Sequence, residues 1–342
     1  MPSLRTLLAA STALALCATA AFAEPACRLH RVASAEATVR DGSPLLVSAT
    51  VANVPVQLVV STGFRYSALT RRFAERAQLP IEDIHAPLYG LETFNVSDIV
   101  YLTSKVNDAF GATDGNFYER TRVPLLRLGS ARSENEMFVL TPEGGDGTDG
   151  QPVGAFGSDY LSGYEVELDP SAGQLNLYDV DHCPGRVVYW SNTYSTVPLH
   201  VDPGTRRITV PVVLDGAQVD AQIDTGSAGT SMPLSLAARS FNINEDSAQL
   251  TPADVVLQAD GRTLRRWTTE FHTLTLGGVI VHNPQISVIA YRDGQAPPIG
   301  SHIKPGEPAE LRIGMNVLKA LHLVISYGEG MLYYTPTRSK PL

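Results

Sequence analysis

The strongest chemical signal in the sequence is the run Asp224-Thr225-Gly226-Ser227. Acid–base hydrolysis needs one group that takes a proton from the attacking water and another that gives a proton to the substrate. Two carboxylates about 3 Å apart serve both purposes, because they cannot both ionise easily and therefore share one proton. Glycine lets the backbone of such a loop turn tightly, and the threonine hydroxyl can anchor an opposing loop. Asp224 is therefore the candidate catalytic residue, and its chemistry requires a second carboxylate.

A related run, Ser61-Thr62-Gly63-Phe64, precedes the first by 163 residues, and its serine stands at the position that corresponds to Asp224. A hydroxyl can hold a water molecule by hydrogen bonds, but it cannot share a low-pKa proton with a carboxylate. The two runs together predict a paired site that has lost one of its two acid–base groups.

Both runs end the same pattern of alternating apolar residues, which must position them. Residues 45–69 and 208–232 match without a gap, and in each segment two alternating stretches flank a turn, near Asn53 and at Asp215-Gly216. Alternation with a period of two around such a turn predicts a β-hairpin with one buried face. The apolar spacing of residues 69, 73 and 77 predicts a short helix after the first hairpin, and Pro233 is expected to open the matching helix in the second copy.

A second set of positions repeats at an offset of 157 residues. Two matches at different offsets predict an internal duplication whose copies differ mainly in the lengths of their loops. The segment Asp181–Gly185 breaks the pattern, so we place the domain boundary there and expect domains at 24–185 and 186–342, with a new strand starting at Val187–Trp190. The repeated positions are Gly157, Leu161, Val166, Leu168, Gly173 and Leu175, which match Gly314, Leu318, Leu323, Ile325, Gly330 and Leu332.

The first 23 residues have the features of a secretory signal peptide. Arg5 supplies a positive charge, an apolar run follows over residues 7–21, and Ala21-Phe22-Ala23 offers small residues for cleavage after Ala23. We therefore expect a periplasmic or secreted protein; a lipid anchor on Cys17 is the alternative, but Leu16 precedes that cysteine where a small residue is expected. The two cysteines that remain, Cys27 and Cys183, are expected to form a disulfide in an oxidising compartment.

The run Ile223–Ser227, in this context, resembles the signature of aspartic peptidases. It ends a predicted hairpin, a helix is expected after it, and the apolar-glycine pair Ile313-Gly314 follows about 90 residues later. This order is similar to that of the retropepsin-like fold. The linker His182–Trp190 also resembles the middle of two-domain secreted bacterial members of this family. The resemblance implies an all-β protein of two tandem retropepsin-like acid-protease β-barrel domains in a bilobal, pepsin-like arrangement, with peptide bound in a cleft between them. It also implies substrate-binding residues around the catalytic Asp224 and at two flap tips, namely Ser61, Thr62, Gly63, Thr225, Gly226, Ser227, Gly90 and Gly261.

Composition disfavours other classes of partner. The chain has 35 acidic and 26 basic residues and a net charge of −9, which argues against nucleic acid or an anionic membrane as ligand. Its eight histidines include no pair at helical spacing, so we expect no metal and no other cofactor. No later apolar stretch is long enough to span a membrane, and the expected partner is a peptide or protein bound by a monomer or a homodimer.

Two functions stay open. One is an aspartic endopeptidase in which Asp224 works weakly with Ser61, pairs with its counterpart in a homodimer of second domains, or is completed by Asp98, Asp108 or Asp114. The other is a pseudoprotease that binds extended peptide by strand addition without cutting it.

Overall fold

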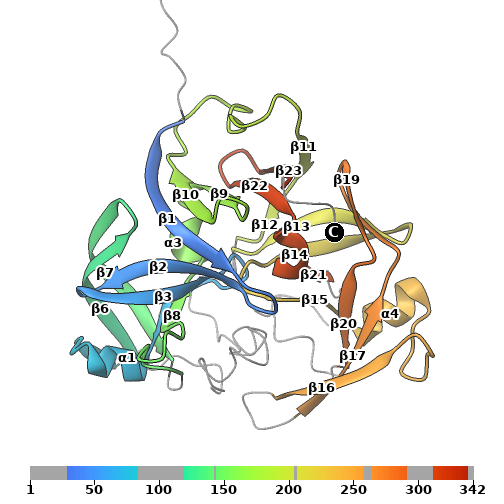
Figure 1. Ribbon diagram of the computed structural model, residues 1–342, viewed down its shortest axis with the longest axis horizontal. Helices are drawn as coiled ribbons and strands as arrows, with labels where there is room; N and C mark the ends of the chain where they lie inside the picture. Colours follow the sequence, from blue (N-terminus) through green and yellow to red (C-terminus); the bar gives the residue numbers. More distant parts are fainter. Residues whose placement is uncertain are drawn as a thin grey trace, which may run out of the picture.

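The computed structural model describes residues 29–83, 119–141, 144–203, 206–257, 263–290 and 311–337. Of the described residues, 52% lie in strands and 9% in helices, and they form a closed six-stranded barrel and a half-barrel sheet, so the predicted two-barrel, all-β fold is confirmed. In Figure 1 the first part of the chain, blue to green, lies at the left and the second part, yellow to red, at the right. We call residues 24–185 the first half and residues 186–342 the second half; the boundary itself stays a prediction.

The first half is built around the predicted hairpin. Strands β2 and β3 pair from Leu46 opposite Val59 to Val51 opposite Val54, and the left-handed backbone of Asn53 (φ 67°) makes the turn. The side chains of β2 alternate between buried and half-buried, which is the burial that the apolar alternation predicts. The elements are β1 (Arg31–Val39), β2 (Leu45–Val51), β3 (Val54–Val60), β4 (Ala68–Thr70), α1 (Arg71–Arg76), β5 (Ile81–Asp83), β6 (Glu119–Leu128), β7 (Ala131–Thr141), β8 (Gly154–Phe156), α3 (Ser158–Leu161), β9 (Glu165–Asp169) and β10 (Gln174–Tyr178).

The second half follows the same plan. Its hairpin turns at Asp215 and Gly216, both with positive φ, and Pro233 immediately precedes the expected helix, where its fixed φ suits the helix start. The elements are β11 (Ser195–Pro198), β12 (His200–Val201), β13 (Ile208–Leu214), β14 (Ala217–Ile223), β15 (Thr230–Pro233), α4 (Leu234–Phe241), β16 (Thr251–Leu257), β17 (Thr263–Glu270), β18 (Thr273–Leu276), β19 (Val279–His282), β20 (Gln285–Ile289), β21 (Leu311–Ile313), α5 (Met315–Leu318), β22 (Leu321–Ser326) and β23 (Met331–Pro336).

A glycine allows a close backbone crossing in each half. A Cβ atom on Gly157 would lie 2.8 Å from the carbonyl carbon of Tyr66, and one on Gly314 would lie 2.4 Å from the carbonyl oxygen of Gly229. These distances are too short for any side chain, so the two repeated glycines are needed where α3 and α5 begin.

A polar pair also recurs beside these crossings. The Ser67 hydroxyl donates to Asp159 (2.8 Å) in the first half, and the Thr230 hydroxyl contacts the Asn316 amide oxygen (2.7 Å) in the second. Burial raises the pKa of Asp159 above its usual value, and the opposite effect of its hydrogen bonds from Ser67 offsets this rise only in part.

Strands from both halves form one continuous sheet. Strand β22 pairs antiparallel with β9, and the strand order β11-β23-β22-β9-β10-β1 continues into the hairpin of the first half. Separating the halves would therefore break a strand pairing as well as expose apolar side chains.

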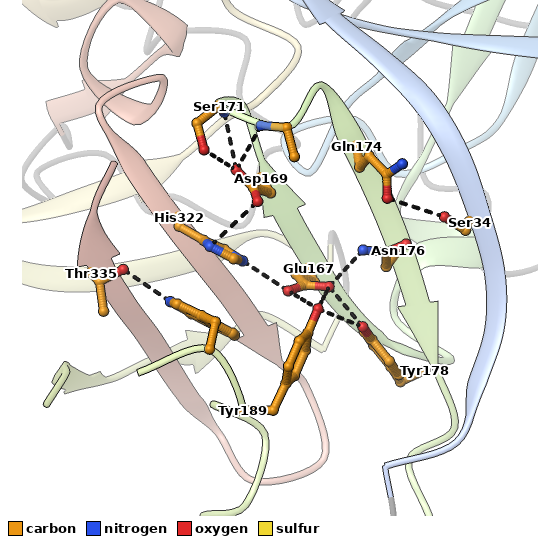
Figure 2. A network of polar contacts seen from close by, with 12 residues as sticks. Ser34, Glu167, Asp169, Ser171, Gln174, Asn176, Tyr178, Tyr189, His322 and Thr335 are labelled. Carbon is orange, nitrogen blue, oxygen red and sulfur yellow. Dashed lines mark hydrogen bonds and ion pairs between the residues drawn. The ribbon is translucent and has the colours of Figure 1, made fainter. Parts of the chain in front are cut away.

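A buried carboxylate lies at the centre of this shared sheet. Glu167 is opposite Val324 in the β9–β22 pairing and is fully buried. Burial raises the pKa of Glu167, but its hydrogen bonds outweigh this effect and hold the pKa below its usual value. Figure 2 shows the partners that converge on it, which are His322 (2.8 Å), Tyr178 (2.8 Å), Asn176 (2.7 Å) and Tyr189 (2.8 Å).

One predicted element is wrong. Residues 187–190 form no strand; their backbone is irregular, and the next strand begins at Ser195. Val187 packs against Val324 and Tyr333, while the Trp190 ring stacks on His322 at 3.8 Å between centroids. The apolar character of this run thus comes from side chains that cover the shared sheet, whose edge beside β23 is taken by β11.

Several predictions fall outside the described residues. These are the signal peptide, Cys27, the two flap tips at Gly90 and Gly261, and Asp98, Asp108 and Asp114. Cys183 is disulfide-bonded, and its pairing with Cys27 stays a prediction. No helix within the described ranges is long and apolar enough to cross a membrane.

Candidate active site

The two predicted runs meet where β3 and β14 end. The Ser61 hydroxyl donates to the Asp224 carboxylate, with Oγ and Oδ1 3.3 Å apart. Both side chains are buried, with 3% of Ser61 and 6% of Asp224 exposed. The structure thus brings together residues 163 positions apart that the repeat predicted to be partners.

Two threonines lock the runs together through the main chain. The backbone N–H of Thr62 donates to Thr225 Oγ1 and that of Thr225 donates to Thr62 Oγ1, both at 3.2 Å. The hydroxyls in turn donate across to backbone carbonyls, Thr62 to Ile223 (2.8 Å) and Thr225 to Val60 (2.7 Å). Each half therefore fixes the loop of the other by the same bonds, as the chemistry of threonine in these runs suggested.

The glycines of both runs allow the two loops to approach closely. A Cβ atom on Gly63 would lie 2.4 Å from the Asp224 carboxyl carbon, and one on Gly226 would lie 2.3 Å from the Ser61 hydroxyl oxygen. Any side chain at either position would collide with the group that faces it, so both glycines are required for the site geometry.

The partners of the Asp224 side chain define what it can do. Oδ1 accepts hydrogen bonds from Ser61 and from the backbone N–H of Gly226 (2.9 Å), while Oδ2 lies 3.8 Å from Nε of Arg312. Within the described part of the chain, no second carboxylate is bonded to Asp224. Among the described residues, the side chains in contact around Asp224 are therefore one carboxylate, one hydroxyl and one guanidinium.

Arg312 is the site residue that the sequence analysis missed. It lies on β21 between Leu311 and Ile313, which are both fully buried in the main core, so alternation directs Arg312 to the opposite face of the strand. Only 7% of Arg312 is exposed. The signal was present in the sequence, because Ile313-Gly314 marked the strand that crosses near Asp224 and Arg312 directly precedes it.

Part of the chain is similar to a known protein family. Residues 210–317 match the family model described as aspartyl protease. The matched segment lies in the second half and includes Asp224-Thr225-Gly226 and Ile313-Gly314. This match agrees with the family predicted from Asp224-Thr225-Gly226 and its surroundings, and no curated protein matches the chain.

Two solved structures were found to resemble this protein in part. The crystal structure of Basic 7S globulin from soybean is 8% identical, with a TM-score of 0.46 over 90% of this chain and 95% of the globulin chain. The crystal structure of a retropepsin-like aspartic protease from Rickettsia conorii is 13% identical, with a TM-score of 0.30 over 43% of this chain and 96% of the other.

Two further observations complete the description of the site. Ser227 is buried beside the site, but its hydroxyl donates to the carbonyl of Gly229 (2.8 Å), two residues further on. In the ranges that the structure describes, no group of three His, Cys, Asp or Glu side chains is arranged to hold a metal ion.

Proposed function

We propose that this protein binds an extended peptide between its two halves, above Ser61 and Asp224, and that a single chain does not hydrolyse that peptide efficiently. The observation that supports the second part is the composition of the site, in which Asp224 faces a serine hydroxyl and the Arg312 guanidinium. A guanidinium neither accepts nor shares a proton, so it cannot replace the missing carboxylate in acid–base catalysis.

The two loops that would face a bound peptide are held together in a defined arrangement. The interlocked Thr62 and Thr225 hold both loops, and Gly63 and Gly226 keep them at close approach. Main-chain hydrogen bonding by strand addition is a mode in which an extended peptide gains affinity without being cut. A protease domain that was duplicated, and whose first copy then lost its aspartate to a serine, would leave both loops in place with a single carboxylate between them.

Hydrolysis by a homodimer of second halves is the less favoured alternative. Such a dimer would bring two copies of Asp224 together, but only after the second half leaves the first. That step would break the β9–β22 pairing and remove Glu167 from its buried partner His322. Breaking a buried, hydrogen-bonded charge network costs several kcal/mol, about 3–5 in comparable cases.

We also propose that the protein acts in the periplasm or outside the cell. The proposal rests on the predicted signal peptide with cleavage after Ala23. The disulfide at Cys183 supports it, because such bonds persist in oxidising compartments.

The test is incubation of a diverse peptide library with the wild type, Asp224→Asn and Ser61→Asp between pH 3 and pH 7, with binding, cleavage and oligomeric state recorded together. We expect the wild type to retain peptides intact and Ser61→Asp, which restores the second carboxylate, to begin cutting. Cleavage by the wild type that Asp224→Asn abolishes would show a peptidase instead, and its dependence on protein concentration would distinguish a homodimer from a monomer.

A further inference from the structure

The two halves differ in chemistry on one face of the sheet beside the active-site loops. In the first half this face carries a small apolar cluster that is separate from the main core. Its members are all buried and lie on β3, β4, β7, β8 and the loop directly after Gly63; they are Val59, Phe64, Ala68, Val139 and Ala155.

The strand registers identify the corresponding residues of the second half. Ala155 pairs with Val59 and Ala68, and Arg312 pairs in the same way with Gln222 and Ser231. Ala68 pairs in parallel with Val139 as Ser231 does with Ser287, and the repeat places Ser227 at the position of Phe64. Every apolar residue of the first-half cluster is therefore replaced by a polar one, the set being Gln222, Ser227, Ser231, Ser287 and Arg312.

Two members of this polar set have the chemistry of an anion site. Gln222 and Arg312 are directly paired on parallel strands, so their side chains emerge on the same face, and Arg312 reaches to 3.8 Å from Asp224. Gln222 is only 2% exposed, and its side-chain nitrogen is buried without a hydrogen-bond acceptor among the described residues. A buried donor left without an acceptor is costly, and a ligand oxygen at this position would remove that cost.

We propose that the bound peptide places an acidic side chain against Gln222 and Arg312 in the second half and an apolar side chain against the Phe64 cluster in the first half. This inference rests on the proposed function, because it names the class of peptide that the same site selects. The pairing of a guanidinium with a ligand carboxylate is a strong, charge-assisted contact. Five N–H donors allow one guanidinium to serve two carboxylates, here those of the ligand and of Asp224.

The test compares peptides that differ only by Glu or Gln at one position, scanned along the peptide and titrated against the protein by fluorescence anisotropy. At one position we expect the Glu peptide to bind about tenfold more tightly, the factor that corresponds to 1.4 kcal/mol. Gln222→Val and Arg312→Ala install the residues that the first half carries at these positions, and both should reduce this preference. Arg312→Lys keeps the positive charge and should retain part of the preference for the Glu peptide.

A matched variant probes the other half. Phe64→Ser installs the residue of the second half, and it should weaken selection of an apolar side chain while leaving the Glu-to-Gln ratio unchanged. Thermal unfolding checks that each variant folds. If Arg312→Ala does not fold, the ratio of Glu-peptide to Gln-peptide affinity in Arg312→Lys and in the wild type still tests the inference. Equal affinity for Glu and Gln peptides at every position would overturn this inference and leave the proposed function standing. Failure to bind any peptide would overturn both.

Discussion

The interlocked threonines permit a quantitative prediction. Thr225→Val keeps the shape of the side chain but removes its hydroxyl, which leaves the carbonyl of Val60 without its donor and the N–H of Thr62 without its acceptor. Both threonine side chains are fully buried. Leaving a buried polar group without a partner costs about 1–3 kcal/mol, so the two losses predict a decrease of about 2–6 kcal/mol in the free energy of unfolding.

The assay is urea unfolding of the wild type, Thr225→Val, Thr62→Val and the double variant, with Thr225→Ser as the control that keeps the hydroxyl. Because both hydroxyls hold the same pair of loops, loss of the first should let water reach the groups that the second would satisfy. The double variant should therefore cost less than the sum of the single variants, with a coupling of about 0.5–3 kcal/mol. A Thr225→Val variant as stable as the wild type, or strict additivity, would refute the reasoning.

Three further predictions concern stability. Gly63→Ala should unfold more easily than the wild type by thermal denaturation, because its Cβ would lie 2.4 Å from the Asp224 carboxyl carbon; an unchanged midpoint would contradict the close approach. The folded state lowers the pKa of Glu167 despite the opposing effect of burial, so this carboxylate stabilises the protein above its unfolded pKa of about 4.3 and loses that contribution as the pH falls through its folded pKa. The stability difference between the wild type and Glu167→Gln, measured by urea unfolding, should therefore shrink in acid, and a constant difference would contradict this. If Cys27 is the partner of Cys183, reduction of the disulfide should lower the free energy of unfolding by about 4–5 kcal/mol by the chain-entropy model. Cys27→Ser should lower it by the same amount. A Cys27→Ser protein that still loses stability on reduction would exclude that pairing.

Local patterns predicted the parts of this fold that depend on neighbouring residues. Alternation predicted the hairpins at 45–60 and 208–223, and apolar spacing or a proline predicted α1 and α4. The apolar run at residues 187–190 was misleading, because Val187, Val188 and Trp190 pack on the shared sheet without forming a strand. Periodicity reports which residues are buried, but it does not show whether the backbone hydrogen bonds are made within a sheet.

The sequence predicted the site in part. The loops that form the site carry recognisable runs of residues, whereas no such run marks the charged groups that surround it. The repeat predicted that Ser61 faces Asp224, and the structure places them in contact. Arg312 and the partners of Glu167 depend instead on pairings between distant strands, such as that of β9 with β22. No local pattern specifies those registers. Ile313-Gly314 marked the strand that carries Arg312, but no comparable signal in the sequence indicated the partners of Glu167.

The measurement that tests the central claim most directly is a single-turnover experiment with protein in excess of a tightly bound peptide, followed by mass spectrometry between pH 3 and pH 7. Excess protein makes even one slow cleavage per site visible. The account predicts that the peptide stays intact on the wild type and is cut by Ser61→Asp under the same conditions. Cleavage by the wild type that disappears in Asp224→Asn would contradict it, because the single carboxylate would then suffice for hydrolysis.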